Sequence, residues 1–264
     1  MNHIDQPWVS MGTPAKKTYD MEIELIQPWS VPVFKTTLPP RILQIMTEIS
    51  DELVANEETE SFSDNLVGQI ETELFLDTNI LEQAGVMGFF LETLSQFVSL
   101  CKHQRNPGEI QRDTWMTEIS KMWIVSQYPG EYNPLHVHDN CKISSTMYLK
   151  IPKMLPARKK RRPSDDGSIQ FVNNSSMDID LSAPAVTISP QVGDFLIFGA
   201  LQQHLVYPFR CEEGDPERRS ISFNAVFQSK EQFDYNVEMI EPIEDLIKEK
   251  KFNEVIKKVN SSSL

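Results

Sequence analysis

The chain has 264 residues, of which 40% are hydrophobic and 9% aromatic, so it can bury a core of its own. Its formal net charge of -13 argues against broad binding to a nucleic-acid backbone or an anionic membrane surface. Cys101, Cys141 and Cys211 form no C-x-x-C pair, which argues against a disulfide framework or a zinc ribbon and predicts reduced thiols in the cytoplasm. No signal peptide or long apolar run is visible, so we expect a soluble protein.

Helices are predicted on both sides of a β region. Residues 1–20 carry Pro and Gly without periodicity and are expected to form a flexible leader. Apolar residues at helical spacing predict an amphipathic helix over 39–56, and a broad apolar stripe predicts a second over 79–103. The second helix should lie against a sheet. Residues 243–264 are expected to form a C-terminal helix and tail.

The β region is marked by short runs rich in Val, Ile, Tyr, Phe and Thr between clusters of Pro, Gly, Asn and Asp. The predicted strands are 118–128, 144–151, 168–173, 185–189, 194–198, 205–209 and 218–228. Loops are expected at 153–167 and 211–217. Short strands in succession are typical of a sandwich or barrel. We therefore expect one mainly β domain over 21–242, with a helical part at 39–104 and a core at 115–228.

Three of the five histidines lie in this β region, as the pair His136 and His138 and the single downstream His204. On an extended strand, residues i and i+2 project from the same face, so the pair can point at one spot while another strand brings His204. Three imidazoles can bind iron, zinc, copper or nickel and leave coordination positions open. A lone histidine in a strand is more often hydrogen-bonded or exposed, so the spacing alone leaves both interpretations open.

Several motifs occur in a fixed order around these histidines. They are YPGEYNPLHVH at 128–138, SSTMYLK at 144–150, GDFLIF at 193–198, His204, and RRSISFN at 218–224. Together they resemble the 2-oxoglutarate/Fe(II)-dependent dioxygenase superfamily, and within it the prolyl-hydroxylase-like branch with an H-x-H motif. The resemblance covers residues 115–228.

The resemblance implies a double-stranded β-helix, the jelly-roll or cupin-like fold, with His136, His138 and His204 as metal ligands. The superfamily usually has H-x-D, whereas this chain has His138 at the third position of the motif. Asp139 is therefore kept as an alternative ligand, or as an acceptor that orients an imidazole N–H.

The resemblance also implies an arginine on the last core strand that pairs with the far carboxylate of 2-oxoglutarate. Arg218 stands in the R-x-S register, and its guanidinium can donate two parallel hydrogen bonds to a carboxylate. Arg219 is the competing candidate. Ser220, on the same strand face as Arg218, could add a hydroxyl donor. Tyr148 either lines the cosubstrate pocket or packs in the core.

The implied activity is that of a non-haem Fe(II)- and 2-oxoglutarate-dependent dioxygenase, using dioxygen to hydroxylate an unidentified protein or small-molecule substrate. The sequence has no phosphate loop, dinucleotide fingerprint or nucleophile elbow. Two alternatives stay open: a cupin-like metalloprotein that does not use 2-oxoglutarate, and a non-catalytic jelly-roll structural or binding protein. Trp123 and Tyr128 are expected in the core. The basic run 159–162 is either a solvated loop or attracts an anionic substrate, and a homodimer through the helices outside the core is a further hypothesis.

Overall fold

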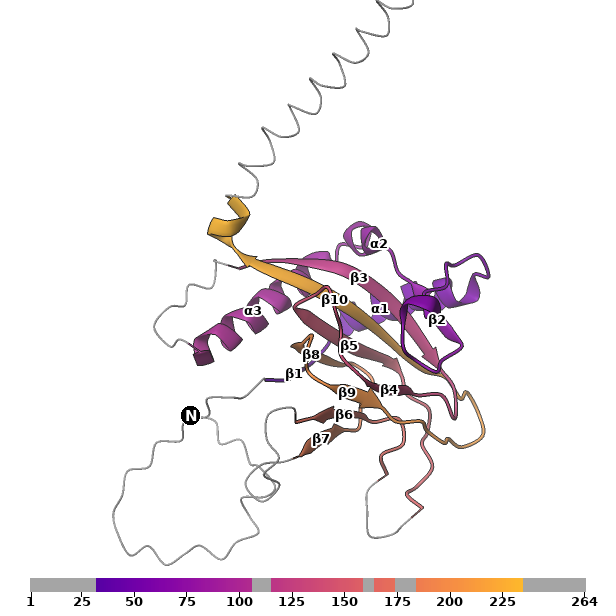
Figure 1. Ribbon diagram of the computed structural model, residues 1–264. Helices are drawn as coiled ribbons and strands as arrows, with labels where there is room; N and C mark the ends of the chain where they lie inside the picture. Colours follow the sequence, from indigo (N-terminus) through magenta and orange to yellow (C-terminus); the bar gives the residue numbers. More distant parts are fainter. Residues whose placement is uncertain (1–31, 106–114, 159–163, 174–183, 235–264) are drawn as a thin grey trace, which may run out of the picture. The chain divides into compact units, whose positions relative to one another are not determined.

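Two antiparallel β-sheets form the centre of the protein (Figure 1). The computed structural model describes residues 32–105, 115–158, 164–173 and 184–234. The larger sheet has the strand order β1-β8-β5-β10-β3-β2, and the smaller one β4-β9-β6-β7. The strands are β1 Phe34–Thr37, β2 Thr72–Phe75, β3 Trp115–Gln127, β4 Asn133–His136, β5 Ile143–Lys150, β6 Ile169–Val172, β7 Ala185–Ile188, β8 Asp194–Gly199, β9 His204–Val206 and β10 Arg218–Ser229. The expected mainly β, jelly-roll class is confirmed.

Helices precede the β core. They are α1 Pro40–Ala55, the 3-10 turn η1 Ser63–Asn65, α2 Thr78–Gln83 and α3 Met87–Arg105. The first follows its prediction, with Pro in the first turn, where its missing N–H costs nothing. The single helix predicted over 79–103 is wrong, because Gly85 adopts a φ of 70° and separates α2 from α3. None of these described helices is long and apolar enough to cross a membrane.

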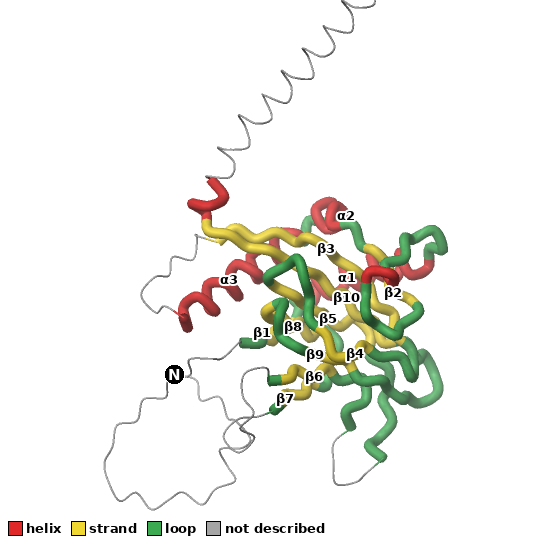
Figure 2. The backbone as a smooth tube through the Cα atoms, viewed as in Figure 1, coloured by secondary structure: helices red, strands yellow, loops and turns green. Residues whose placement is uncertain are grey.

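One face of the large sheet packs against α1 and α3, away from β6, β7 and β9 (Figure 2). Along β10, Ile221 and Phe223 join this core, and the Phe223 ring lies 5.9 Å from that of Phe90 in α3. The alternate residues Arg218 and Ser220 line a cavity on the opposite face. Because side chains alternate along a strand, β10 contributes to the core and to the cavity at once.

The predicted strands of the β region are all present, with small differences at their ends. The sequence pattern does not predict β1 or β2, which precede the β region, or β4, which lies among Pro, Gly and Asn residues typical of a turn. The predicted loops are confirmed where they are described, and residues 159–163, which hold the basic run, lie outside the described part. The predicted leader 1–20 and C-terminal helix 243–264 also lie outside it.

Candidate metal centre

The three candidate histidines come from neighbouring segments of the small sheet. His136 ends β4, His204 begins β9, and the two residues face each other across this antiparallel pair. His138 lies just beyond β4, where its backbone N–H donates to the carbonyl of Ala200 over 2.9 Å. Of His136 and His138, only the first belongs to a strand, so the alternation of an extended strand does not explain the pair, although the ring nitrogens of both residues belong to one group of potential ligands.

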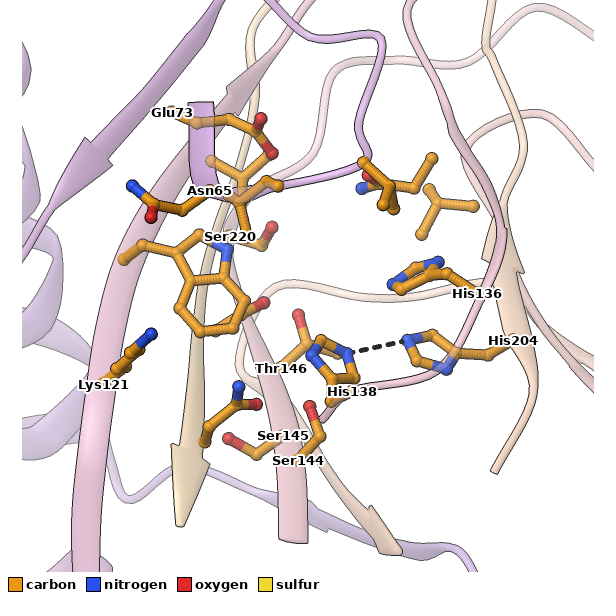
Figure 3. A pocket seen from close by; sticks show the side chains of 18 of the residues that line it. Asn65, Glu73, Lys121, His136, His138, Ser144, Ser145, Thr146, His204 and Ser220 are labelled. Atoms are coloured by element: carbon orange, nitrogen blue, oxygen red, sulfur yellow. Dashed lines mark hydrogen bonds between the residues drawn. The ribbon is translucent and has the colours of Figure 1, made fainter. Parts of the chain in front are cut away.

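The three imidazoles form one cluster (Figure 3). One ring nitrogen from each of His136, His138 and His204 lies within 4.8 Å of the others, and Nε2 of His138 is 3.4 Å from Nε2 of His204. Two nitrogens that are each about 2.1 Å from one metal ion are themselves separated by about 3.0–3.4 Å at octahedral to tetrahedral angles. The distance between His138 and His204 therefore suits two ligands of one divalent ion, and His136 lies close enough to be the third.

Backbone carbonyls orient two of the three rings. Nδ1 of His136 lies 2.7 Å from the carbonyl oxygen of Pro134, and Nδ1 of His204 lies 2.8 Å from that of Gln202. When Nδ1 donates to these carbonyls, Nε2 carries the lone pair that a metal requires. For these two histidines, carbonyls therefore have the orienting role that the sequence suggested for Asp139.

Burial keeps the cluster uncharged. It lowers the pKa of His136, and together with the neighbouring His136 it lowers the pKa of His138 to about 4 and that of His204 to about 3. Neutral imidazole is the metal-binding form, so no proton has to be displaced from these rings at neutral pH.

Asp139 lies beside the cluster without being part of it. Its side chain is exposed at the cavity, and the group of potential ligands that the described residues form contains only the three histidines. A regular strand would also turn position i+3 away from His136. The geometry thus favours a three-histidine set over one completed by Asp139.

Arg218 and Tyr148 lie in the same cavity and have unsatisfied donors. Arg218 is 2% exposed, donates from Nη1 to Oε1 of Gln127 over 2.8 Å, and places Cζ 4.9 Å from the ring centroid of Tyr148. Its Nε and the Tyr148 hydroxyl are buried without a hydrogen-bond partner among the described residues. Burial lowers the pKa of Arg218 and raises that of Tyr148. Two buried donors facing one cavity are what a carboxylate ligand would satisfy.

Arg219 points to the other face of the large sheet. Its guanidinium pairs with Glu217 at 2.5 Å and with Asp51 of α1 at 2.5 Å, and it also donates to the hydroxyl of Ser50. All of this lies on the helical side, because successive residues of β10 face opposite ways. Of the two adjacent arginines, only Arg218 is available to a ligand in the cavity.

The cavity that contains these groups has a volume of about 350 Å³. Ser220 lines it and is the cross-strand neighbour of Tyr148. Thr146 also lines it and is the cross-strand neighbour of Ser222. Apolar rings cover the histidine side, where the Phe198 ring lies 4.7 Å from that of His204. A polar cavity with one apolar side suits a small anionic molecule beside a metal.

Two aromatic residues differ from their predicted places. Trp123 is buried as expected, but it also lines the cavity, with its ring 6.0 Å from that of His138. Tyr128 is 40% exposed, so its predicted place in the core is wrong. It follows β3 at a turn, where the chain leaves the sheet.

Sequence reasoning missed the part of the cavity that precedes the β core. Asn65 and Glu73 come from η1 and β2, and both line the cavity. Neither carries a motif, and both precede the β region that the sequence pattern marks. Only the pairing of β2 with β3 places these residues near the metal cluster.

The donor set fits both groups that a 2-oxoglutarate oxygenase requires. The three neutral imidazoles could hold Fe(II) and leave further coordination positions open. Nε of Arg218 and the hydroxyl of Tyr148 could take a carboxylate of 2-oxoglutarate. The fit rests on unsatisfied polar atoms within a single cavity.

Comparison with known proteins agrees with this chemistry. Residues 121–224 match the family described as "Putative 2OG-Fe(II) oxygenase". No curated protein matches the chain by sequence.

Solved structures show limited similarity. A prolyl-4-hydroxylase from Pseudomonas putida has 16% identity and a TM-score of 0.43, with 73% of this chain and 91% of that chain covered. A 2OG-Fe(II) oxygenase from Burkholderia pseudomallei has 14% identity and a TM-score of 0.44, with 73% and 85% covered. A prolyl hydroxylase from Trichoplax adhaerens, solved with a hypoxia inducible factor peptide fragment, has 15% identity and a TM-score of 0.45, with 74% and 83% covered. Identities this low carry no information about the substrate.

The matched region contains the histidine cluster, Tyr148 and Arg218. The resemblance drawn from the motifs is thereby confirmed. Residues 121–224 therefore resemble the family described as "Putative 2OG-Fe(II) oxygenase", both in sequence and in the residues of the candidate metal centre.

Proposed function

We propose that the chain is a 2-oxoglutarate-dependent dioxygenase that hydroxylates an unactivated C–H bond, with Fe(II) held by His136, His138 and His204. Arg218 and Tyr148 bind the far carboxylate of 2-oxoglutarate. The observation that carries this assignment is the pair of buried, unsatisfied donors, Nε of Arg218 and the Tyr148 hydroxyl, in the cavity of the histidine cluster. A cupin-like protein that binds only a metal has no need of them.

When bound, Fe(II) and 2-oxoglutarate supply the oxidising power, and the overall reaction turns a C–H bond, dioxygen and 2-oxoglutarate into an alcohol, succinate and carbon dioxide. The chain's own residues bind and orient the reactants. His136 and His204 are held by backbone carbonyls, so the direction of their lone pairs is fixed before the metal arrives.

The wall around the histidines excludes water. Phe171 and Phe198 pack at 5.0 Å from each other, and their rings lie 6.0 and 4.7 Å from that of His204. They belong to a buried cluster between the two sheets. Excluding water beside the metal protects a reactive centre from side reactions.

The decisive experiment is anaerobic titration of metal-free protein with Fe(II) and then with 2-oxoglutarate. The chelated Fe(II)·2-oxoglutarate centre gives a weak visible charge-transfer band, which we expect in the wild type and expect to be much weaker at equal ligand concentration in Tyr148→Phe. Tyr207→Phe is the matched control, because its hydroxyl donates to Gln170 outside this cavity. Iron binding without the band would support the cupin-like alternative, and no metal binding would support a non-catalytic jelly roll.

We further propose that the protein works in a reducing compartment such as the cytoplasm. All three cysteines, Cys101, Cys141 and Cys211, are free. The homodimer stays a prediction that sedimentation of the full chain would test.

A further inference from the structure

Glu73 is a buried carboxyl group that the chemistry described above does not use. It lies on β2, the edge strand of the large sheet, is 1% exposed, and lines the same cavity as the histidine cluster. Its Oε2 has no hydrogen-bond partner among the described residues, and no ion pair involves it there. A buried acceptor of this kind is costly unless a ligand satisfies it.

The strand register separates Glu73 from the cosubstrate groups. Glu73 pairs with Val125, Val125 with Ser220, and Ser220 with Tyr148, so these four residues form one row across β2, β3, β10 and β5. At about 4.8 Å per strand, Glu73 lies roughly 10 Å from Ser220 and roughly 14 Å from Tyr148 along the sheet. Glu73 and His204 lie on opposite sides of the pocket in Figure 3. The cavity therefore has a second end, beyond the reach of 2-oxoglutarate bound at Arg218.

Aromatic and aliphatic side chains surround this second end. Phe62 and Trp123 stack with ring centroids 5.8 Å apart, and both line the cavity. Leu66 and Val125 belong to the same apolar cluster and also line it. One carboxylate among aromatic faces recognises a cation, since the rings attract positive charge and the carboxylate pairs with it.

The local charges favour a cationic ligand as well. Burial, reinforced by the nearby negative charge of Glu131, raises the pKa of Glu73 to about 7. The other charged side chains that line the cavity, besides the histidines, are Lys121, Asp139 and Arg218. Arg218 donates to Gln127, and Lys121 stands four residues before Val125, the cross-strand neighbour of Glu73. A ligand cation would supply the partner that Glu73 lacks.

We propose that Glu73 determines substrate specificity by binding a protonated amine or guanidinium that the primary substrate carries on an apolar stem. The stem lies against the stacked pair Phe62 and Trp123, and the charged end meets the carboxylate. The identification of this ligand as the substrate rests on the proposed function. The binding of a cation at Glu73 does not.

The test uses the full chain with Fe(II) and 2-oxoglutarate under anaerobic conditions, where no turnover occurs. The probes are N-acetyl-lysine methylamide and N-acetyl-arginine methylamide, each compared with the neutral N-acetyl-norleucine methylamide. A charge-assisted hydrogen bond to a buried group contributes about 1.5–3 kcal/mol, so the cationic probes should bind roughly ten-fold or more tightly than the neutral one. Binding should also lower the pKa of Glu73, which carboxyl NMR measures directly.

Glu73→Gln should abolish the preference for cationic probes and leave the Fe(II)·2-oxoglutarate band unchanged. Glu71→Gln is the matched control, because Glu71 is exposed two residues earlier in the chain, and it should retain the preference. Equal binding of neutral and cationic probes, no binding of the cationic probes, or an unchanged preference in Glu73→Gln would overturn the proposal. If the wild type shows the band without the preference, the inference fails and the proposed function stands. If the wild type shows the preference without the band, cation binding at Glu73 stands and the proposed function fails.

Discussion

Replacing each of the adjacent arginines Arg218 and Arg219 by methionine should affect stability and cosubstrate binding in opposite ways. Arg219 is fully paired, to Glu217 and to Asp51, on the helical side of β10. Arg218 makes no ion pair among the described residues and faces the cavity. Methionine has a similar length and no charge, so each substitution removes mainly the electrostatic contribution.

The magnitudes follow from what each arginine touches. Loss of Arg219 leaves the buried carboxylate of Glu217 with Lys150 and Ser126 as partners, and breaking a buried pair in this way costs about 3–5 kcal/mol. Loss of Arg218 removes a buried cation that has no ionic partner in the described part of the chain, and the removal of this desolvation cost stabilises the folded state by about 1–4 kcal/mol. The lost hydrogen bond to Gln127 and ring contact with Tyr148 offset about 1–3 kcal/mol. Arg218→Met should therefore lie between about 2 kcal/mol less and about 3 kcal/mol more stable than the wild type, short of the loss in Arg219→Met.

Cosubstrate binding should show the reverse pattern. Arg218→Met removes the charge-assisted hydrogen bond from Nε to 2-oxoglutarate, which contributes about 1.5–3 kcal/mol, so the Kd should rise roughly 10–100-fold. Arg219→Met should retain 2-oxoglutarate binding wherever it is folded.

Urea denaturation with and without Fe(II) and 2-oxoglutarate, under anaerobic conditions, measures both effects. The reasoning would be refuted if Arg218→Met destabilised the protein as much as Arg219→Met does, or if 2-oxoglutarate still stabilised it. Either result would mean that Arg218 is a structural residue and that the cavity binds the cosubstrate elsewhere.

Three further predictions concern single side chains of the cavity. Tyr148→Phe removes a buried, unsatisfied hydroxyl, so metal-free stability should rise by about 1 kcal/mol while 2-oxoglutarate affinity falls roughly ten-fold, as denaturation and calorimetry would show; lower stability would contradict it. The pKa of Glu73 is raised from 4.5 to about 7, so between these pH values the folded state binds a proton that the unfolded state has lost, and stability falls as the pH rises. The stability of Glu73→Gln should match that of the wild type below pH 4.5 and exceed it above pH 7 by on the order of 3 kcal/mol. Unfolding measured across this pH range tests the prediction, and a difference that does not change with pH would contradict it. His138→Ala should weaken Fe(II) binding beyond the roughly 10–100-fold typical of outer-sphere changes, whereas Asp139→Ala should not, and the reverse result in a metal titration would make Asp139 the ligand.

Local sequence was sufficient for the β core and for the metal cluster. Alternation in β10 and the runs of Val, Ile and Phe predict the strands, because burial of one or both faces imposes that pattern. The pair His136 and His138, followed by His204, predicts the cluster, which the structure gathers within 4.8 Å. The geometry differs in one respect: His138 reaches the cluster from a loop held by Ala200 rather than from a strand.

The R-x-S register favours Arg218 over Arg219, but only the tertiary structure shows what separates the two arginines and which distant residue also lines the cavity. Arg218 and Arg219 are adjacent residues of the same type. Arg219 forms an ion pair with Asp51 because its face of β10 packs against α1, whereas Arg218 lines the cavity on the other face. Glu73 stands far ahead of the motifs, before the β region that the sequence pattern marks, and reaches the cavity because β2 pairs with β3. Periodicity records that a face is buried, whereas the partner that buries it depends on contacts between residues far apart in the chain.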